Sequence, residues 1–167
     1  SGLDEELEMI RDQFRRFADE QVTPYAHEWH LKDELIPMEI IDSLAEMGVF
    51  GLTIPEEFGG FGLTKASMVV VSEELSRGYA SVADQCGLIE LISSLLVRHG
   101  TEAQRRLLPG ILAMKTKVAY CITEAEAGTD VSGIKTTAVR SGGGWRLSGS
   151  KIWIHNAPVA DLGFVLA

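Results

Sequence analysis

The residue types best suited to binding chemistry lie together at residues 120–131, in the stretch YCITEAEAGTDV. A β-prone run at 118–123 passes there into a loop of small residues at 125–130. The end of a strand presents backbone N–H and C=O groups at regular spacing, and a loop of Ala, Gly and Thr lets a ligand come close to the main chain. Gly128 followed by Thr129 suits a phosphate group, because backbone amides and a hydroxyl can donate to it with little bulk in the way.

A second stretch, SKIWIHN at residues 150–156, predicts another strand that carries the indole of Trp153. An indole ring can stack on a flat ligand. Taken alone, a strand that runs into a Gly/Thr loop is more typical of an ordinary β-turn, since Gly, Thr and Asp are common turn residues. The presence of both stretches, in this order, favours a shared ligand site.

Together with residues 134–138 and 147–151, these stretches resemble the flavin-binding middle segment of the acyl-CoA dehydrogenase family. Upstream, GLTIPEEFGGFG at 51–62 is similar to the signature of that family's first helical domain. The resemblance spans essentially the whole chain. It implies FAD bound to a middle β-domain and the α,β-dehydrogenation of an acyl-CoA thioester to an enoyl-CoA. A carboxylate base would remove an α-proton while the β-hydride moves to the flavin.

The resemblance also implies roles for individual residues. Tyr120, Ile122 and Thr123 match positions that contact the isoalloxazine ring through main-chain and hydroxyl groups, where donors stabilise the anionic reduced ring. Gly128 and Thr129 match positions that meet the pyrophosphate, with Thr129 also near the thioester end of the substrate, and Trp153 matches the aromatic residue beside the flavin. The implied cofactor-binding set is Tyr120, Cys121, Ile122, Thr123, Gly128, Thr129, Trp153, Ile154 and His155.

Three positions depart from the family pattern. Ala125 stands where a proline is usual, which frees a backbone dihedral and loosens the loop. Thr129 replaces the commoner serine but keeps a hydroxyl. His155 stands where a Thr or Ser hydroxyl usually bonds flavin N5. Its imidazole either donates to N5 in place of that hydroxyl or points to solvent, and the sequence leaves both readings open.

The apolar stretch at 81–97 predicts a buried helix. The resemblance implies that Leu88, Leu91 and Leu95 line the acyl-chain pocket, so they are substrate-binding candidates, although a plain core role is the simpler reading. No catalytic residue is assigned. The family's base lies in a C-terminal helical bundle, and neither Glu124 nor Glu126 occupies its motif position.

The sequence stops at Ala167 within a strand pattern, so we expect a fragment of a longer enzyme that is inactive by itself. An unfinished sheet would leave a strand edge open to pairing with another copy through 162–166.

Periodicity predicts the elements that must position these residues. Helices are expected from Asp4 to near Pro24, from Pro37 to Gly48, from Thr64 to Gly78, from Ser81 to Val97 and from Thr101 to just before Pro109, with one more turn at 111–114. Strands are expected at 118–123, 135–140, 145–150, 152–154 and 162–166, with a hairpin turn at 141–144. Near 115–117 the helical periodicity gives way to alternation, with more β-branched residues and glycines. This change divides a helical domain, 1–116, from the first part of a middle β-domain, 117–167. The expected fold class is α+β: an all-α helical bundle followed by an incomplete antiparallel β-domain, a truncated β-barrel.

Composition narrows the function classes. The chain has 167 residues, 46% of them hydrophobic, which is enough for a packed core. A formal net charge of −9 argues against a nucleic-acid surface. The longest apolar runs, at 69–71 and 88–97, predict no membrane span, and no basic segment marks a signal peptide. Cys86 and Cys121 lie far apart with no metal-ligand spacing, which favours a reducing compartment, here the cytoplasm.

The expected partners are therefore an acyl-CoA substrate, an electron-accepting flavoprotein or other acceptor, and further copies of the chain in a homo-oligomer. Two alternatives remain open. One is a flavin-dependent acyl-CoA oxidase or monooxygenase on the same scaffold. The other is a non-catalytic helical interaction module, favoured by the missing base, the His155 change and the acidic composition.

Overall fold

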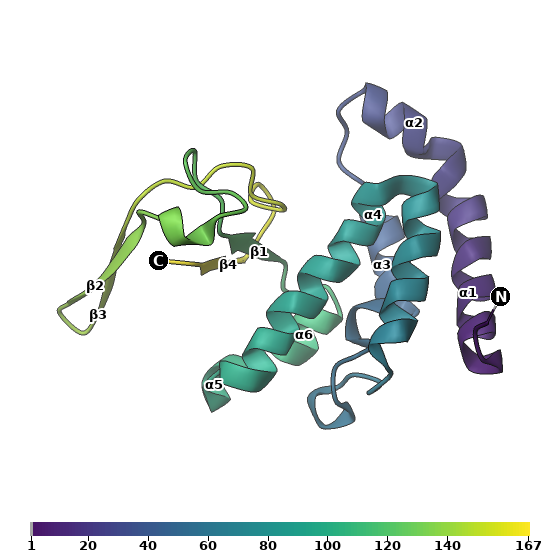
Figure 1. The fold of residues 1–167 in the computed structure, drawn as a ribbon, viewed down its shortest axis with the longest axis horizontal. Coiled ribbons are helices and arrows are strands. Elements are labelled where there is room, and N and C mark those ends of the chain that lie inside the picture. The colour runs from purple at the N-terminus through teal and green to yellow at the C-terminus, as the bar shows by residue number, and fades with distance from the viewer. Residues whose placement is uncertain (1) are drawn as a thin grey trace. The chain divides into compact units, whose positions relative to one another are not determined.

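Helices dominate the first part of the chain and short strands the second in the computed structural model, which describes residues 2–167 (Figure 1). The chain divides into two compact units, Ser1–Lys115 and Thr116–Ala167. The helices of the first unit are α1 (Glu5–Phe17), α2 (Thr23–Leu31), α3 (Met38–Glu46), α4 (Lys65–His99), α5 (Glu102–Arg105) and α6 (Leu108–Leu112). The strands of the second are β1 (Val118–Cys121), β2 (Thr137–Ser141), β3 (Gly144–Ser148) and β4 (Leu162–Val165).

The first helical stretch runs past the end that the sequence predicts at Pro24. Asp4 caps α1 by accepting from the Leu7 N–H at 2.9 Å, and a π-helical turn at Ala18–Val22 joins α1 to α2. The prediction was wrong because Pro24 lies in the first turn of α2, where its missing N–H is not needed. By contrast, the predicted start of α3 at Pro37 and its stop at Gly48 (φ 75°) are confirmed.

α4 covers the two central helices that the sequence predicts. Tyr79 has an extended backbone (φ −160°, ψ 116°) inside it, between the predicted stop at Gly78 and the predicted start at Ser81. The bend is visible in Figure 1, where α4 turns between two straight arms. A Cβ at Gly78 would lie 3.3 Å from both Ala18 Cβ and Thr23 Oγ1. Glycine therefore lets the bend pack closely against the π-helical turn.

α4 is also the helix around which the core of the first unit is built. Its fully buried side chains include Val71, Leu75, Val82, Ile89 and Ile92. Among the described residues it alone is long and apolar enough to cross a membrane, with a mean hydropathy of 1.4 over its most apolar window. The sequence predicts no such run because it divides this helix in two. A core helix commonly meets the same criterion.

Backbone hydrogen bonds fold the Gly/Pro-rich segment 51–62 back on itself. The Phe61 N–H donates to Gly51 O at 2.9 Å, and the Gly62 N–H donates to Ile54 O at 2.9 Å. The segment is therefore an ordered loop. α6, which buries Leu108, Ile111 and Leu112, packs beside this loop. The capping box predicted between Thr101 and Gln104 is confirmed at the start of α5. The prediction that this helix ends before Pro109 is confirmed, because α5 ends at Arg105 and the proline lies in the first turn of the separate helix α6.

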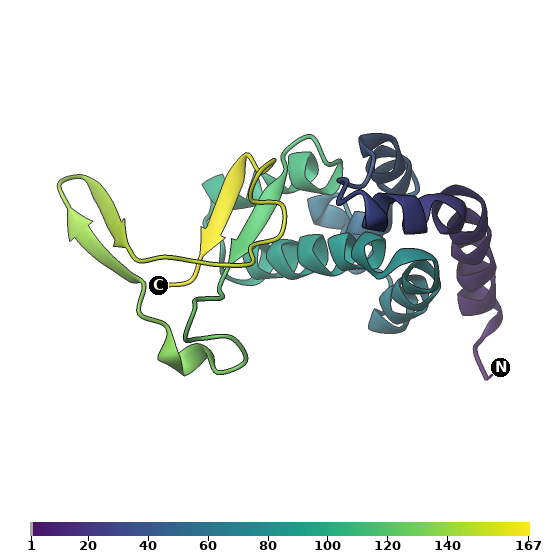
Figure 2. The same ribbon diagram turned by 90° about the horizontal axis from the view of Figure 1, so that it is seen from above.

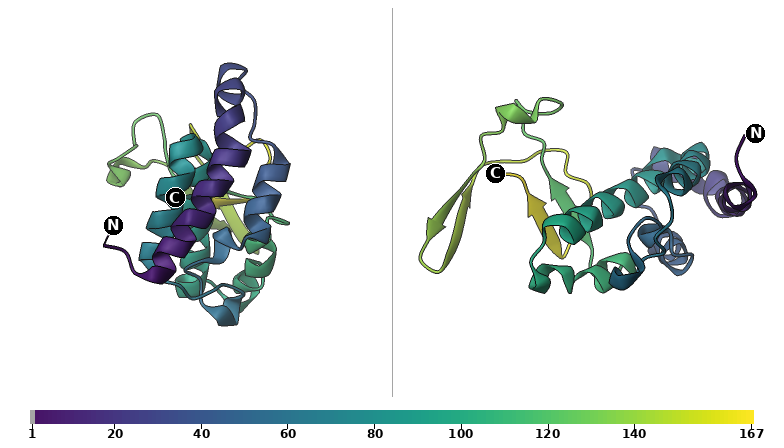
Figure 3. Two further views of the ribbon diagram at one scale, coloured as in Figure 1. Left: turned by 90° about the vertical axis from the view of Figure 1, so that its right-hand side faces the viewer. Right: turned by 60° about the horizontal axis from the view of Figure 1, so that its bottom comes forward.

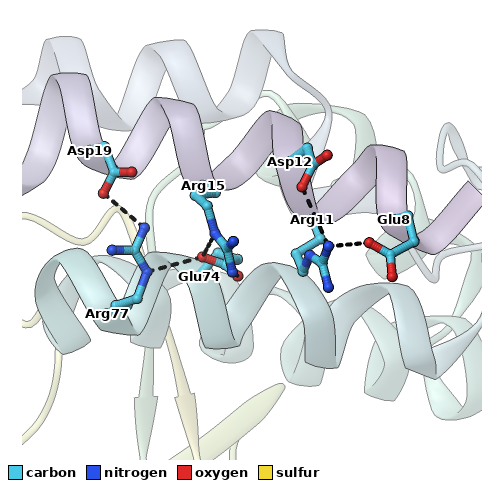
Figure 4. A network of polar contacts seen from close by, with 7 residues as sticks. All are labelled: Glu8, Arg11, Asp12, Arg15, Asp19, Glu74 and Arg77. Carbon is cyan, nitrogen blue, oxygen red and sulfur yellow. Dashed lines mark hydrogen bonds and ion pairs between the residues drawn. The ribbon is translucent and has the colours of Figure 1, made fainter. Parts of the chain in front are cut away.

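A buried carboxylate ties α1 to α4 (Figure 4). Glu74, 3% exposed, accepts from Arg15 at 2.6 and 3.1 Å and from Arg77 at 3.1 Å, and Arg77 also donates to Asp19 at 2.8 Å. Arg15 reaches down from α1 onto Glu74, as Figure 4 shows from close by, beside a second group formed by Arg11, Glu8 and Asp12. The hydrogen bond from Arg15, helped by Arg77, outweighs burial and lowers the pKa of Glu74. Figure 3 shows α1 lying along this face of α4.

Replacing Glu74 with glutamine is expected to lower the unfolding free energy of the first unit by about 2 kcal/mol. The two arginines would lose their common counter-charge, but both are half exposed, so the loss stays below that of a fully buried pair. Chemical denaturation followed by far-UV circular dichroism measures it. The matched control is Glu102→Gln, because the Glu102–Arg106 pair is largely exposed and should contribute no more than about 0.5 kcal/mol. Equal effects of the two substitutions would refute the role of Glu74.

In the second unit, β1 and β4 form a parallel pair, with Val118 opposite Leu162 and Cys121 opposite Val165. Figure 2 shows the two arrows pointing the same way. The expected fold class, a helical domain followed by partial β-structure, is confirmed, but β1 and β4 are not antiparallel and no barrel closes within residues 2–167. The parallel sense follows from the long connection at 122–161, which returns the chain to the same end of β1.

β2 and β3 form the predicted hairpin, an antiparallel pair with Ser141 opposite Gly144 and a two-residue turn in which Gly142 has φ 61°. The predicted strand at 152–154 is wrong. Trp153 has φ 55°, which a strand excludes, and this segment is held by individual hydrogen bonds instead of a ladder.

Candidate cofactor site

The end of β1 supplies the first group of predicted site residues. Tyr120 and Cys121 lie in β1, and Ile122 and Thr123 follow it directly; all four are half-buried. β4 occupies one edge of the strand, where the Leu166 N–H donates to Cys121 O at 3.1 Å. Burial raises the pKa of the Cys121 thiol despite the nearby ammonium of Lys151, so this thiol stays protonated at neutral pH.

A tight turn carries the chain from β1 into the small-residue loop. Glu124 and Ala127 exchange both backbone hydrogen bonds, at 2.9 and 3.2 Å. Gly128 and Thr129 follow and are exposed, and a Cβ at Gly128 would have no heavy atom within 4 Å. Within residues 2–167 neither the Thr123 nor the Thr129 hydroxyl makes a hydrogen bond. The loop therefore offers free donors in open space.

The Glu124 carboxylate is the centre of the local hydrogen-bond network, although the residue is only 9% exposed. It accepts from the backbone N–H groups of Lys135 at 2.8 Å and Thr136 at 2.9 Å, from the Thr136 hydroxyl, and from Lys151 Nζ at 2.9 Å. These hydrogen bonds, that of the Thr136 hydroxyl first, lower the pKa of Glu124 to about 2. The carboxylate is therefore ionised throughout the neutral range.

Lys151 connects the two predicted stretches. Its Nζ donates to Ile122 O at 2.7 Å as well as to Glu124, and its side chain is 11% exposed. The next residue, Ile152, adds a main-chain hydrogen bond between the same two segments: its N–H donates to Thr123 O at 2.9 Å. The end of β1 and the start of the second stretch consequently lie side by side.

The remaining residues of the second stretch follow this junction. Trp153 is 86% exposed, Ile154 is half-buried and His155 is exposed. Asn156, at φ 62°, donates from Nδ2 to Val118 O at 3.4 Å and so returns the chain towards β1. The site thus combines an exposed indole, backbone groups at a strand end and the hydroxyl-bearing loop.

The three leucines predicted to bind substrate lie on α4 in the first unit. Leu88 and Leu95 are half-buried and Leu91 is 41% exposed, at spacings that put them along one side of the helix. The buried core of that helix is formed by other residues, such as Ile89 and Ile92.

The roles of Glu124, Thr136 and Lys151 are not apparent from the sequence alone. The sequence presents Glu124 only as a carboxylate outside the motif position of the base, and Lys151 only as part of a motif. The signal in the sequence was a pair of opposite charges at the ends of predicted strands. Glu124 directly follows the strand predicted at 118–123, and Lys151 directly precedes the strand predicted at 152–154. Their pairing spans 27 positions and depends on the tertiary fold.

Comparison with known proteins gives consistent results for both units. The family model described as "Acyl-CoA dehydrogenase, N-terminal domain" matches residues 4–115, and that described as "Acyl-CoA dehydrogenase, middle domain" matches residues 119–167. A (2S)-methylsuccinyl-CoA dehydrogenase from Cereibacter sphaeroides is 58% identical over 158 residues, which cover 94% of this chain and 29% of that protein.

Two solved structures are also similar. A glutaryl-CoA dehydrogenase in complex with glutaryl-CoA has a TM-score of 0.88 and 32% identity, over 99% of this chain and 43% of that one. A glutaryl-CoA dehydrogenase from Mycobacterium smegmatis in complex with FADH2 has a TM-score of 0.89 and 27% identity, over 98% of this chain and 42% of that one. The chain thus spans less than half the length of each of these proteins.

Proposed function

Since the chain belongs to the acyl-CoA dehydrogenase family, we propose that it forms the helical domain and the first part of the FAD-binding domain of an enzyme that oxidises acyl-CoA thioesters to enoyl-CoA products. The observation that carries this proposal is the junction of the two stretches, in which the end of β1 lies beside the segment bearing Trp153. These are the stretches that the family resemblance assigns to the flavin. A longer protein is supported by the share of each relative that the chain covers.

The residues at the junction fit a flavin. An indole that is 86% exposed offers a flat apolar surface to a ring system. The exposed amide of Gly128 and the unbonded hydroxyl of Thr129 suit a pyrophosphate, and no side chain fills the space at Gly128. We assign Tyr120, Cys121, Ile122, Thr123, Ile154 and His155 to the remainder of the cofactor contacts.

Bound FAD supplies a two-electron acceptor for the hydride that leaves the β-carbon of the substrate. This chain's part is to bind and orient. Backbone donors and the Thr123 hydroxyl stabilise negative charge that develops beside them, and Trp153 excludes water from one side of the ring. Thr129 lies where the family resemblance puts the thioester end, and Leu88, Leu91 and Leu95 are assigned to the acyl chain.

No residue of this chain is proposed as the base that removes the α-proton. Glu124 is saturated by four donors and has a pKa of about 2, which makes it a poor proton acceptor near pH 7. Glu126 is exposed and paired with Lys135. We assign the base to a part of the protein outside this chain, together with the surfaces for an electron-accepting flavoprotein and for homo-oligomer formation.

For the substrate we propose a short acyl-CoA whose acyl group carries a free carboxylate in addition to the thioester. The proposal is supported by the names of the relatives, which act on methylsuccinyl-CoA and glutaryl-CoA. The test is to add methylsuccinyl-CoA, glutaryl-CoA or butyryl-CoA to the intact flavoprotein without oxygen. Bleaching of the flavin absorbance with formation of an enoyl product supports dehydrogenation, and the faster acyl-CoA defines the preference. Rapid peroxide formation in air would favour an oxidase, and colourless protein after FAD addition would favour a non-catalytic module.

Trp153 provides a direct test of the cofactor position. FAD bound beside the indole quenches its fluorescence, so Trp153→Phe should abolish most of the quenching, and Trp153→Ala should weaken FAD binding about tenfold. Trp145 is the matched control, an exposed tryptophan on β3 whose ring centroid lies 4.9 Å from the Arg140 guanidinium carbon. Its substitution should leave both signals unchanged. Wild-type quenching and affinity in the Trp153 variants would exclude this position for the flavin.

A further inference from the structure

Trp153 has an unusual setting for a residue assigned to hold a ligand. Its ring is 86% exposed, and among residues 2–167 no aromatic ring or cation stacks on it. Its backbone has φ 55°, in the left-handed region that few residues other than glycine adopt. Packing of the indole therefore does not fix its direction. The backbone on either side must do so.

Resting on the function proposed above, we propose that Glu124, Thr136 and Lys151 are positioning residues that hold the Trp153 segment against the end of β1. We call these three side chains the latch. In this arrangement the indole and the strand end are set in place for the same ligand before it binds.

The contacts of the latch come from three separate segments. Lys151 Nζ bridges Ile122 O at 2.7 Å and Glu124 Oε1 at 2.9 Å. Glu124 in turn accepts from residues 135 and 136, next to the start of β2. The polar groups have defined directions, so they fix the relative positions of these segments within narrow limits.

The stability of the fold alone is a weak reason for burying the Glu124–Lys151 ion pair. Two charges about nine-tenths buried have lost most of their hydration, and apolar residues of similar volume often stabilise a fold as well or better. An apolar contact, however, lacks the directionality that four donors on one carboxylate provide. This difference favours a geometric role for the latch.

The main chain strengthens the same junction on both sides of Lys151. On one side, the Ile152 N–H donates to Thr123 O at 2.9 Å. On the other, Gly149 passes so close to Thr136 that a Cβ there would lie 2.3 Å from Thr136 Oγ1. The segment is therefore held immediately before Trp153, and the ligand does not have to order it.

The test is Lys151→Gln, read out by two independent measurements. The first is amide hydrogen exchange at Ile152 in the full chain without FAD, followed by NMR. The second is the FAD dissociation constant of the intact protein, from tryptophan quenching. We expect faster exchange at Ile152 and an FAD affinity lower by about tenfold, and partial rescue of both by Lys151→Arg.

The matched control is Lys117→Gln, which removes a lysine charge from the same unit without touching the latch and should change neither measurement. Should the second unit of Lys151→Gln fail to fold, Thr136→Val serves instead, because it removes one hydroxyl bond and keeps the ion pair. It is compared with Thr137→Val at the exposed neighbouring position. A threefold to fivefold weaker FAD affinity in Thr136→Val alone is expected, about the effect of one hydrogen bond.

Unchanged exchange at Ile152 in Lys151→Gln would overturn the latch. Faster exchange with unchanged FAD affinity would overturn its positioning role and leave a structural one. Failure of the wild-type protein to bind FAD would overturn the proposed function instead, while the exchange measurement would still decide whether the latch holds the segment.

Discussion

Replacing Gly60 with alanine is expected to lower the unfolding free energy of the first unit by about 3 kcal/mol, the upper end of the range for overpacking. The new Cβ would lie 2.0 Å from Ile54 O, 2.5 Å from Ile54 C and 2.6 Å from Ile54 Cβ. Two of these are backbone atoms, which cannot rotate away. The Gly62 N–H bonds the same Ile54 carbonyl, so a shift there would also open the loop at 51–62.

The same substitution at Gly87 is the matched control for Gly60, and its expected sign is opposite. Gly87 is exposed within α4, and an added Cβ would meet no heavy atom within 4 Å. Alanine there should stabilise the helix by about 0.5–1 kcal/mol. Urea denaturation followed by circular dichroism measures both variants. A Gly60→Ala protein as stable as the wild type would mean that Gly60 does not pack closely against Ile54.

Replacing Glu124 with glutamine is expected to disrupt the second unit and with it the flavin site. Glutamine is uncharged, so the ion pair with Lys151 is lost. It also has an NH2 group where the carboxylate has a second oxygen, and this group donates at a position that needs an acceptor. The backbone N–H groups of Lys135 and Thr136 would then compete for a single oxygen. We expect the intact protein to lose bound FAD on gel filtration. NMR spectra of the full chain should show lost dispersion for residues 116–167 and native signals for the first unit.

The matched control for Glu124 is Glu126→Gln, two residues along the same turn. Glu126 is exposed and paired with Lys135, which is also exposed, so this variant should retain both the FAD and the spectrum. Equal behaviour of the two variants would show that the Glu124 network does not organise the second unit.

The pH dependence of the second unit follows from the same carboxylate. The folded pKa of Glu124 is about 2, below the ordinary value of 4.5 that applies to the unfolded chain. The unfolded state therefore binds the proton more readily, and the contribution of Glu124 to stability is fully present above about pH 4.5. It is lost as the pH falls from there towards 2. NMR spectra of the wild-type chain should therefore show the signals of residues 116–167 losing dispersion as the pH falls through this range.

Much of the helical unit follows from local sequence. The start of α3 at Pro37 and its end at Gly48 were predicted correctly, as was the capping box at Thr101, because each depends on residues within one turn of the helix end. The error at Pro24 is also local, because a proline is tolerated in the first turn of a helix such as α2. The π-helical turn at Ala18–Val22 is different: it packs against the bend of α4, and no local signal predicts that contact.

The sequence by itself determined the composition of the candidate site: a strand end, a loop with Gly128 and Thr129, and an indole at position 153, in the order that resembles a flavin-binding domain. Spacing and residue type are enough for that, because each motif is short and contiguous. Only the tertiary structure decided that Trp153 leaves the strand conformation and that β4 runs parallel to β1. It also decided that Glu124 and Lys151 meet. These features depend on hydrogen bonds between segments distant in the chain, and the energy of such bonds depends on burial that no local pattern records.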